Sequence, residues 1–552
     1  MKPAPASSLP IPDPRLGFLR HGHPASEFLA SISLLLLLAS QSPAQLNPGP
    51  AAMHGPYSQK DVGSAVQTWV RSVTADARPD AVVERLEPYQ VDGETVAFIA
   101  YLQDGGFCLA GANDLLLPVY LYSPHGSYNP KNPAYQYILG EMDSRLKAMR
   151  KSLAEQDQQR QPSLDALRER AAYWQTLIAG QMPAPATVLK APPPGPASMV
   201  LPLTSHWHQG SPYNDQTPEL TPGTDNHTVV GCVATAMAQI MYYWKWPVTG
   251  VGSGSIPYDY RWRTTWSWEP LTSDPGIPNT ATWTNRLQYN TSNHQLLMNG
   301  YWDGEIYYWA QGINTSPAYL TALAKLWDRM THATTTAYAD FGATTYDWSI
   351  LADRHADPPD AGAQEAAKVS SHAGIAVNMS YGTGTSYSNG GHALAAYKDH
   401  FRYDPDAQND HTDPYTMIAE IQWLRPMQMH GTDARGGHSW VAYGYSQASS
   451  QFMMNWGWDD GSDDWYTWDQ WFGTDQWHTS RIAPVNVKFV GADATGDGSP
   501  NTPYQNLDAA LAAVPDGSTL IFKANSQNTF STSPLIINRP MTLKGYNVTI
   551  SK

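Results

Sequence analysis

Apolar residues recur at helical spacing directly after Cys232. In the run GCVATAMAQIMYYWKWP they predict one apolar face on a helix that begins at this cysteine: Val233, Ala236, Met237, Ile240, Met241 and Trp244. The start of a helix carries unpaired backbone N–H groups and the positive end of the helix dipole, and both favour a thiolate over a thiol. The pattern therefore predicts a nucleophilic cysteine at a helix start.

The segment from about Ser64 to Ile178 mixes strand and helix patterns. The run VAFIAYL predicts a strand that ends at Asp104, and FCLAGANDLLLPVYLYS follows it. Two helical stripes come next, the second behind Ser163 as its N-cap. The stripes consist of Ile138, Leu139, Met142, Leu146, Met149 and Leu153, and of Leu164, Leu167, Ala171, Trp174 and Leu177. Residues 183–196, which include APPPGPA, predict an extended, exposed linker where proteolytic cutting is expected.

The region from about Leu201 to Pro484 contains the cysteine helix and, near its end, two predicted strands. The runs SWVAYGY and QFMMNW carry the strand patterns, and the polar turn SQASS joins them. The stretch from about Gly250 to Tyr346 is dense in Trp, Tyr, Asn and Thr and shows little periodicity. We therefore expect mostly long loops there.

Composition narrows the possible classes of function. A chain of 552 residues predicts about three or four domains. The formal net charge is −15 and no cluster of Lys and Arg occurs, which argues against a nucleic-acid-binding surface. The 2 cysteines cannot form a disulfide framework, so packing must stabilise the fold.

The N-terminus has the pattern of a secretory signal peptide. Arg15 and Arg20 precede a short apolar run over residues 28–39, and small residues follow up to Ala44. The run is too short to span a bilayer comfortably, and nothing later approaches about twenty apolar residues. We therefore expect a signal peptide over residues 1–44 and an exported, soluble mature chain.

Chemistry that starts from a cysteine thiolate needs an imidazole, a group that orients the imidazole and a donor for an oxyanion. The chain offers one of each. Cys232 is the expected nucleophile, and His438, in GGH at a strand start, is the expected general acid and base. Asn455 is expected to accept from the ring N–H, with Trp456 screening that bond from water. Gln209 is expected to lend its side-chain amide to the oxyanion.

The region from about Trp207 to Trp468 resembles the streptopain family of papain-like cysteine peptidases. The matching motifs come in the order of the family: WHQGSPYN, GCVATAMAQIMYYWKWP, TYDW, VNMSYGTGTS, GGHSWVAYGY and NWGW. Upstream, GGFCLAGANDLLLPVYLYS is similar to the propeptide of that family. The resemblance implies an α+β fold in which a helix layer bearing the cysteine packs against an antiparallel sheet bearing the histidine.

The resemblance also implies a division of the chain. We expect a propeptide over residues 45–182, a proline-rich linker and processing region over 183–200, a papain-like domain over 201–484 with an aromatic-rich insertion at about 250–346, and a β-rich segment over 485–552. The propeptide would be of α+β type and would cover or distort the site until it is removed.

The function implied is that of a secreted, zymogenic cysteine endopeptidase that forms a thioester on Cys232 with His438 as general acid and base. Its expected partners are protein or peptide substrates and its own propeptide as an inhibitor, without nucleic acid, a membrane span, a metal or an organic cofactor. Two alternatives stay open: a secreted adhesion or glycan-binding protein that keeps the fold without activity, and acyl transfer of the transglutaminase kind. Association with the cell surface also stays open.

Cys108 and His392 have two interpretations at this point, and two aspartates differ from the family pattern. Cys108 is either a buried strand residue or a disulfide partner of Cys232 that locks a zymogen. His392 also follows two glycines, but HALAAYKDHF reads as a helix, so His438 is preferred. After NWGW the family has two glycines where this chain has Asp459 and Asp460, which puts the local loop geometry in doubt.

The sequence after Pro484 resembles the opening of right-handed parallel β-helix domains. A Gly-Asp loop, a cap helix and short strands follow one another in GDGSPNTPYQNLDAALAAVPDGSTLIFKA and LIINRPMTLKGYNVTISK. Only about one coil is present, whereas such stacks need roughly three repeats. The segment is therefore either truncated or packed on the preceding domain. Asp493 and Asp497 are interpreted as a solvated Asp-Gly turn rather than as calcium ligands.

Overall fold

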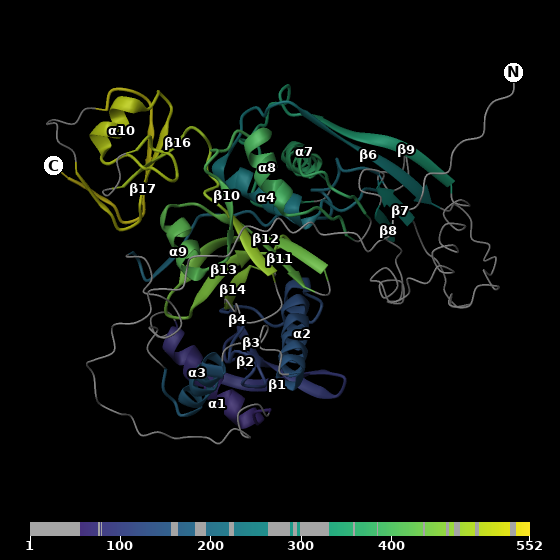
Figure 1. Ribbon diagram of the computed structural model, residues 1–552, viewed down its shortest axis with the longest axis vertical. Helices are drawn as coiled ribbons and strands as arrows, with labels where there is room; N and C mark the ends of the chain where they lie inside the picture. The colour runs from purple at the N-terminus through teal and green to yellow at the C-terminus, as the bar shows by residue number, and fades with distance from the viewer. Residues whose placement is uncertain are drawn as a thin grey trace. The chain divides into compact units, whose positions relative to one another are not determined.

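A computed structural model describes most of the chain beyond residue 55 (Figure 1). The described residues are 56–74, 78, 80–155, 164–182, 195–219, 226–262, 287–290, 295–298, 331–356, 359–382, 385–433, 436–459, 463–467, 475–491, 496–529 and 537–551. The expected signal peptide at 1–44, the cap Ser163, Asp460, Asp493 and most of the predicted linker lie outside them.

The leading domain, residues 56–182, is an antiparallel meander with helices beside it. Its elements are α1 (Gln59–Val73), β1 (Val83–Val91), β2 (Glu94–Leu102), β3 (Phe107–Gly111), β4 (Leu121–Ser123), α2 (Pro133–Glu155) and α3 (Leu164–Ile178). Strand β2 is the strand predicted from VAFIAYL, and α2 and α3 are the two predicted helices. The turn between β2 and β3 requires glycine: Gly106 has a φ of 92°, and a Cβ there would lie 2.7 Å from the carbonyl O of Ser123.

The central domain, residues 195–484, packs helices against an antiparallel sheet, so the predicted α+β class is confirmed. The helices are α4 (Cys232–Trp244), α7 (Ala361–Ala376), α8 (Gly391–Asp399) and α9 (Pro414–Gln422). The strands are β5 (Ser198–Val200), β10 (Gln408–His411), β11 (Met427–Asp433), β12 (Gly436–Ser446), β13 (Gln451–Asn455), β14 (Asp464–Thr467) and β15 (Asp475–Ser480). Helix α4 lies on this sheet, where the Nε2 atom of Gln428 in β11 donates to the carbonyl O of Val233.

The strands of the leading and central domains belong to one sheet. Its order is β1-β2-β3-β4-β14-β13-β12-β11-β15-β10, with β5 added against β12 (Figure 1). The two domains join where β4 pairs with β14, Tyr122 opposite Trp465 and Leu121 opposite Tyr466. The resemblance to a propeptide predicted a cover for the site but not this shared sheet.

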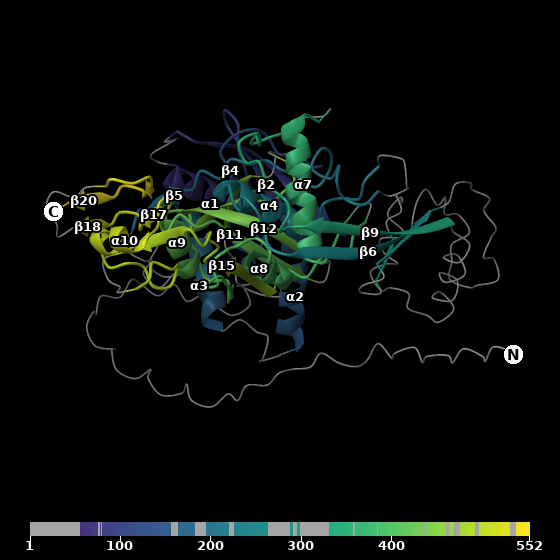
Figure 2. The same ribbon diagram turned by 90° about the horizontal axis from the view of Figure 1, so that it is seen from above.

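The aromatic-rich insertion contains strands, so the expectation of mostly long loops was wrong for its described part. Strands β6 (Ser253–Trp262), β7 (Leu287–Asn290), β8 (Gln295–Met298) and β9 (Thr331–Asp340) form a sheet in the order β8-β7-β6-β9 (Figure 1). Figure 2 shows β6 and β9 side by side. Strands β6 and β9 pair along their whole length, from Ser253 opposite Asp340 to Trp262 opposite Thr331. The run THATTTAYAD forms β9 on the β propensity of Thr and Tyr, without the apolar alternation that marks a strand in a sequence.

The C-terminal segment forms a short parallel stack. Its elements are β16 (Val487–Val490), α10 (Leu507–Ala513), β17 (Thr519–Phe522), β18 (Gln527–Thr529), β19 (Thr542–Lys544) and β20 (Thr549–Ser551). Strands β16, β17 and β19 pair in parallel, as do β18 and β20, which agrees with the expected opening of a β-helix. Asp497 accepts from the backbone N–H of Ser499 (3.0 Å) and from the Thr502 hydroxyl (2.8 Å), in the manner of an aspartate turn.

This segment packs on the central domain. The ring of Phe489 meets that of Trp423 edge-on at 5.7 Å, and the N–H of Ala524 donates to the carbonyl O of Gln422. Of the two expectations for the segment, packing on the preceding domain is therefore what the structure shows. Among the described residues, no helix is long and apolar enough to cross a membrane.

Candidate active site

Cys232 begins helix α4, as its sequence pattern predicts. Its thiol is free and partly buried. The N-cap residue Gly231 has a φ of 89°, and a Cβ there would lie 2.8 Å from the Sδ atom of Met379. Only glycine fits this turn, because a side chain would be strained and would also collide. The backbone conformation of Gly231 therefore fixes how the chain enters α4 and places the Cys232 thiol at the start of the helix.

His438 lies in β12, on the strand that faces the thiol. The backbone N–H of the next residue, Ser439, hydrogen-bonds to the Cys232 sulfur. The Nε2 atom of His438 donates to the carbonyl O of Trp456 at 3.0 Å. With Nε2 committed to that carbonyl, Nδ1 is the ring nitrogen that can exchange a proton with Cys232.

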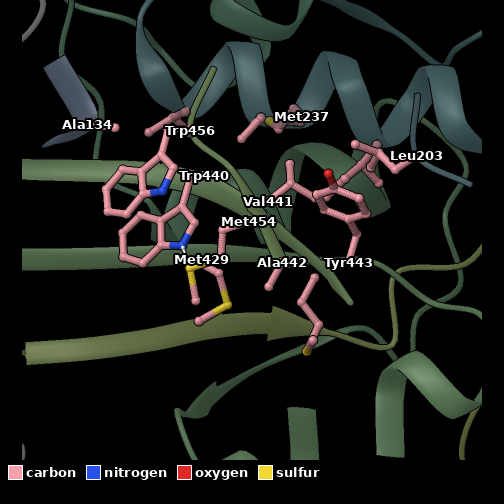
Figure 3. Close-up of a cluster of buried hydrophobic side chains, with 14 of the residues drawn as sticks. Ala134, Leu203, Met237, Met429, Trp440, Val441, Ala442, Tyr443, Met454 and Trp456 are labelled. Carbon is pink, nitrogen blue, oxygen red and sulfur yellow. Dashed lines mark hydrogen bonds between the residues drawn. The ribbon is translucent and has the colours of Figure 1, made fainter. Parts of the chain in front are cut away.

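Aromatic rings enclose the imidazole. Trp458 stacks on it with centroids 4.2 Å apart, and Trp456 lies nearly parallel to it at 5.3 Å. Trp440 continues the stack 4.7 Å from Trp456 and donates from its indole N–H to the sulfur of Met454 (Figure 3). The sequence predicted that Trp456 would lie beside the His438 ring. It did not predict the same for Trp458, although both are in the motif NWGW.

Asn455 does not hydrogen-bond to His438, which corrects the expectation for this residue. Its Oδ1 atom accepts from Gln239 Nε2 and from the Gly457 N–H, both at 2.9 Å. Its Nδ2 group donates to the Ser205 carbonyl (2.7 Å) and to the Asp463 carboxylate (3.1 Å). The side chain is buried, and these partners on α4 and on neighbouring loops occupy both of its ends.

Gln209 and His392 are the two other residues that the sequence analysis considered for the site. The carbonyl O of Gln209 accepts from the N–H of Val230, which holds its loop against the chain that enters α4. The oxyanion role of the Gln209 amide stays a prediction. His392 lies at the start of α8, and its Nδ1 atom is 3.0 Å from the carbonyl O of Val377.

The loop after NWGW accommodates an aspartate where the family has glycine. Asp459 has a φ of 72°, in the left-handed region that glycine adopts without cost and that aspartate tolerates. Its carboxylate lies 3.0 Å from the guanidinium of Arg354. The backbone conformation that glycine would supply is thus retained in this chain.

The thiol and the imidazole are both neutral at neutral pH in this structure. Burial raises the pKa of Cys232, and the N–H groups of Ser439, Val233 and Cys232 itself offset only part of that effect. Burial lowers the pKa of His438 to about 4, although the bond to the Trp456 carbonyl opposes it. The helix start alone predicted a thiolate, but here the cost of burying the charge is larger than the gain from the N–H groups.

Comparison with known proteins identifies this region. The model of the peptidase C10 family matches residues 207–338 and 306–466. These residues make up slightly less than half of the chain. The resemblance to the streptopain family that the motifs suggested is therefore confirmed, and the proteins that this part of the chain resembles are cysteine peptidases.

Individual relatives match different shares of the chain. Streptopain of Streptococcus pyogenes is 22% identical over 458 residues, which are 79% of this chain and 91% of streptopain. The thiol protease/hemagglutinin PrtT of Porphyromonas gingivalis is 26% identical over 258 residues, 46% of this chain. The match covers only 21% of the length of PrtT. Among solved structures, a fragment of prointerpain A from Prevotella intermedia (mutant C154A) aligns with a TM-score of 0.44 and 21% identity over 72% of this chain and 97% of the fragment.

The leading domain contacts the candidate site. Tyr137 of α2 lies with its ring 6.2 Å from that of His438 and 5.3 Å from that of Trp456. A second contact is at the joint of the shared sheet, where the hydroxyl of Tyr135 donates to the Asp464 carboxyl at 3.1 Å. Two aromatic side chains of one helix therefore meet the central domain at and beside the histidine.

The two cysteines of the chain are not joined. Both thiols are free, and Cys108 is fully buried in β3, where burial raises its pKa strongly. The hypothesis of a disulfide between Cys108 and Cys232 is therefore wrong for this structure. Cys108 packs in the apolar core of the leading domain, as its alternative interpretation states.

Proposed function

We propose that the chain is a secreted, zymogenic cysteine endopeptidase. The observation that carries the proposal is a hydrogen bond between α4 and β12. The Cys232 thiol at the start of α4 accepts it from the backbone N–H of Ser439, the residue directly after His438 in β12. A thiol and an imidazole held this way fit nucleophilic attack on a peptide carbonyl followed by protonation of the leaving amine.

The proposed reaction has two halves. The proton of Cys232 passes to Nδ1 of His438, and the sulfur attacks the carbonyl carbon of the substrate, whose oxygen becomes an oxyanion. The backbone N–H of Cys232 and the amide of Gln209 would donate to that oxygen. The C–N bond then breaks as His438 gives its proton to the leaving amine, and a thioester remains on Cys232. Water, deprotonated by His438, hydrolyses the thioester to the carboxylic acid and restores the thiol.

In the proposed zymogen, the leading domain acts as the propeptide. Tyr137 lies over the pair of rings formed by His438 and Trp456, where a substrate would have to approach. Removal of the domain would admit water, lower the pKa of Cys232 and raise the pKa of His438, so that a thiolate and an imidazolium can form.

The chain between the domains limits where activation would cut. Residues from Pro196 onward are bound to the central sheet: the Pro196 carbonyl accepts from the Tyr445 hydroxyl (2.6 Å), and β5 pairs with β12. Cutting within or after β5 would remove a strand from the sheet. We therefore place the activating cut before Gly195, inside the proline-rich linker.

The experiment compares the wild-type chain with Cys232→Ala after export from a suitable host. The exported wild-type chain is expected to lose about 17 kDa more than the variant, in proportion to residues 45–194 in a 60.8 kDa chain of 552 residues, and the exported variant to keep these residues. Identical behaviour of the two chains, together with no labelling of the wild type by a thiol-directed probe, would contradict the proposal. Retention of both chains inside the host would contradict secretion alone.

A further inference from the structure

Helix α4 carries one buried amide that no step of the proposed reaction uses. Gln239 lies seven residues after Cys232, close to two helical turns along the same face, and its side chain is fully buried. The other buried positions of α4 are apolar apart from Thr235. A buried amide destabilises a helix face of this kind unless both of its ends are hydrogen-bonded.

Both ends of the Gln239 amide are bonded, and one bond leads toward the site. Its Oε1 atom accepts from the Ser205 hydroxyl at 3.0 Å. Its Nε2 group donates to Oδ1 of Asn455 at 2.9 Å. The helix that positions the nucleophile is thus tied by a side chain to the residue just before Trp456.

A single peptide group connects Asn455 with the histidine. The group between Trp456 and Gly457 is planar, so fixing its N–H fixes the direction of its C=O. Its N–H donates to Oδ1 of Asn455, and its C=O accepts from Nε2 of His438. The same Oδ1 atom accepts from Gln239.

The turn also rests directly on the helix. Gly457 has a φ of 70°, and a Cβ there would lie 2.9 Å from the Thr235 side chain and 3.8 Å from Nε2 of Gln239. The peptide group therefore has little room to rotate, and Asn455, which is held by Gln239, supplies the polar contact that selects its direction.

We propose that Gln239 is a positioning residue for His438. Acting through Asn455 and the Trp456–Gly457 peptide, it keeps the proton of the imidazole on Nε2 and turns Nδ1 toward Cys232. It couples the direction of the ring to the helix that bears the thiol. This role rests on the proposed peptidase function and adds a residue that the sequence motifs did not single out.

The first test is Gln239→Met, which keeps the length of the side chain and removes the amide. In the processed enzyme we expect kcat to fall about tenfold, with KM changed less than about twofold, because substrate contacts are kept while the imidazole is misoriented. The matched control is Gln422→Met, another fully buried glutamine, which donates to the Tyr445 hydroxyl in another part of the domain. The control is expected to lower thermal stability without lowering kcat.

A second variant separates positioning from packing. Gln239→Glu keeps the shape, and its protonated carboxyl can still donate to Asn455, whereas the carboxylate cannot. Its activity relative to the wild type is therefore expected to fall as pH rises through the pKa of that carboxyl, at unchanged fold by circular dichroism. Wild-type kcat and pH profile in both Gln239 variants would overturn the role, as would an equal loss of kcat in the Gln422 control. A wild-type chain without peptidase activity would instead overturn the proposed function.

Discussion

The indole of Trp458 lies 4.2 Å from the imidazole of His438, with the two ring planes 27° apart. This contact covers the face of the imidazole, and burial holds the pKa of His438 at about 4. A histidine enclosed in this way loses its proton far below neutral pH, because the interior solvates the imidazolium poorly. The stack with Trp458 is therefore one of the contacts whose burial of the ring lowers the pKa of His438.

Trp458→Ala is expected to raise the pKa of His438 from about 4 toward its ordinary value of 6.5, because water reaches one face of the ring. The titration of the His438 ring protons by NMR in the Cys232→Ala background measures the shift. Trp423→Ala, which removes an indole that packs on Phe489 instead, serves as the control and is expected to leave that titration in place. An unchanged titration in the Trp458 variant would contradict the assigned cause.

Tyr137→Ala is expected to expose the thiol in the uncut chain, since this ring lies over His438 and Trp456. The alkylation rate of Cys232 at pH 7, measured with iodoacetamide on unprocessed protein, should rise several-fold as the pKa of the thiol falls. Tyr338→Ala, at a side chain 60% exposed on β9, should alkylate like the wild type. Equal rates for all three proteins would show that Tyr137 does not limit access.

Attachment of the leading domain is expected to weaken as pH rises through about 7. Burial at the joint between β4 and β14 raises the pKa of Asp464 to about 7. Repulsion from Asp463 acts in the same direction, whereas the hydrogen bond from Tyr135 lowers the pKa. A raised pKa in the attached state means that attachment binds a proton, so its stabilising effect is full below the ordinary carboxyl pKa and is lost above about 7.

Hydrogen exchange of β4, followed from pH 5 to 9 after correction for the intrinsic rate, measures this effect. Asp464→Asn should remove the pH dependence, because the amide does not ionise, while Asp80→Asn on the exposed surface should keep it. A slope in Asp464→Asn equal to that of the wild type would assign the effect to another group.

A mature chain that begins at Leu203 is expected to be less stable than one that begins at Gly195. The shorter chain lacks β5, whose Met199 is buried opposite Tyr445, and burial of a methionine side chain contributes about 1.5 to 3 kcal/mol. Thermal unfolding of the two chains, both carrying Cys232→Ala, should show a midpoint several degrees lower for the shorter one. Equal midpoints would mean that β5 adds nothing and that the cut is not limited to the linker.

The sequence predicted the parts of the site that depend on one element each. Cys232 follows from the period of α4, and His438 follows from a glycine pair before a strand pattern. The hydrogen bonds of Asn455 could not be predicted in this way. Gln239, which donates to Oδ1 of Asn455, lies 216 positions earlier, and the residues next to Asn455 in the sequence do not indicate this contact. The pKa of the thiol was mispredicted for a related reason: the helix start is a local feature, whereas the burial that raises this pKa depends on tertiary packing.

Strands outside the apolar alternation escaped prediction. Strand β9 is stabilised by its pairing with β6, which ends about seventy residues before β9 begins. Neither segment alone carries a sequence pattern that predicts this pairing. The shared sheet escaped for the same reason. Strand β4 is only three residues long, and its pairing with β14 joins two segments that the sequence places in separate domains.

Release of the leading domain would change the status of β14. In the uncut chain this strand is interior, with β13 on one side and β4 on the other. Once β4 departs, β14 becomes the edge of the sheet, and its outward N–H and C=O groups are open to any extended chain. The exposed edge covers the positions of Trp465 and Tyr466 and the N–H of Thr467, which donates to the Tyr120 carbonyl in the uncut chain, and this is short for strand addition. A mature enzyme of this design would leave its propeptide behind without acquiring a strong site for aggregation.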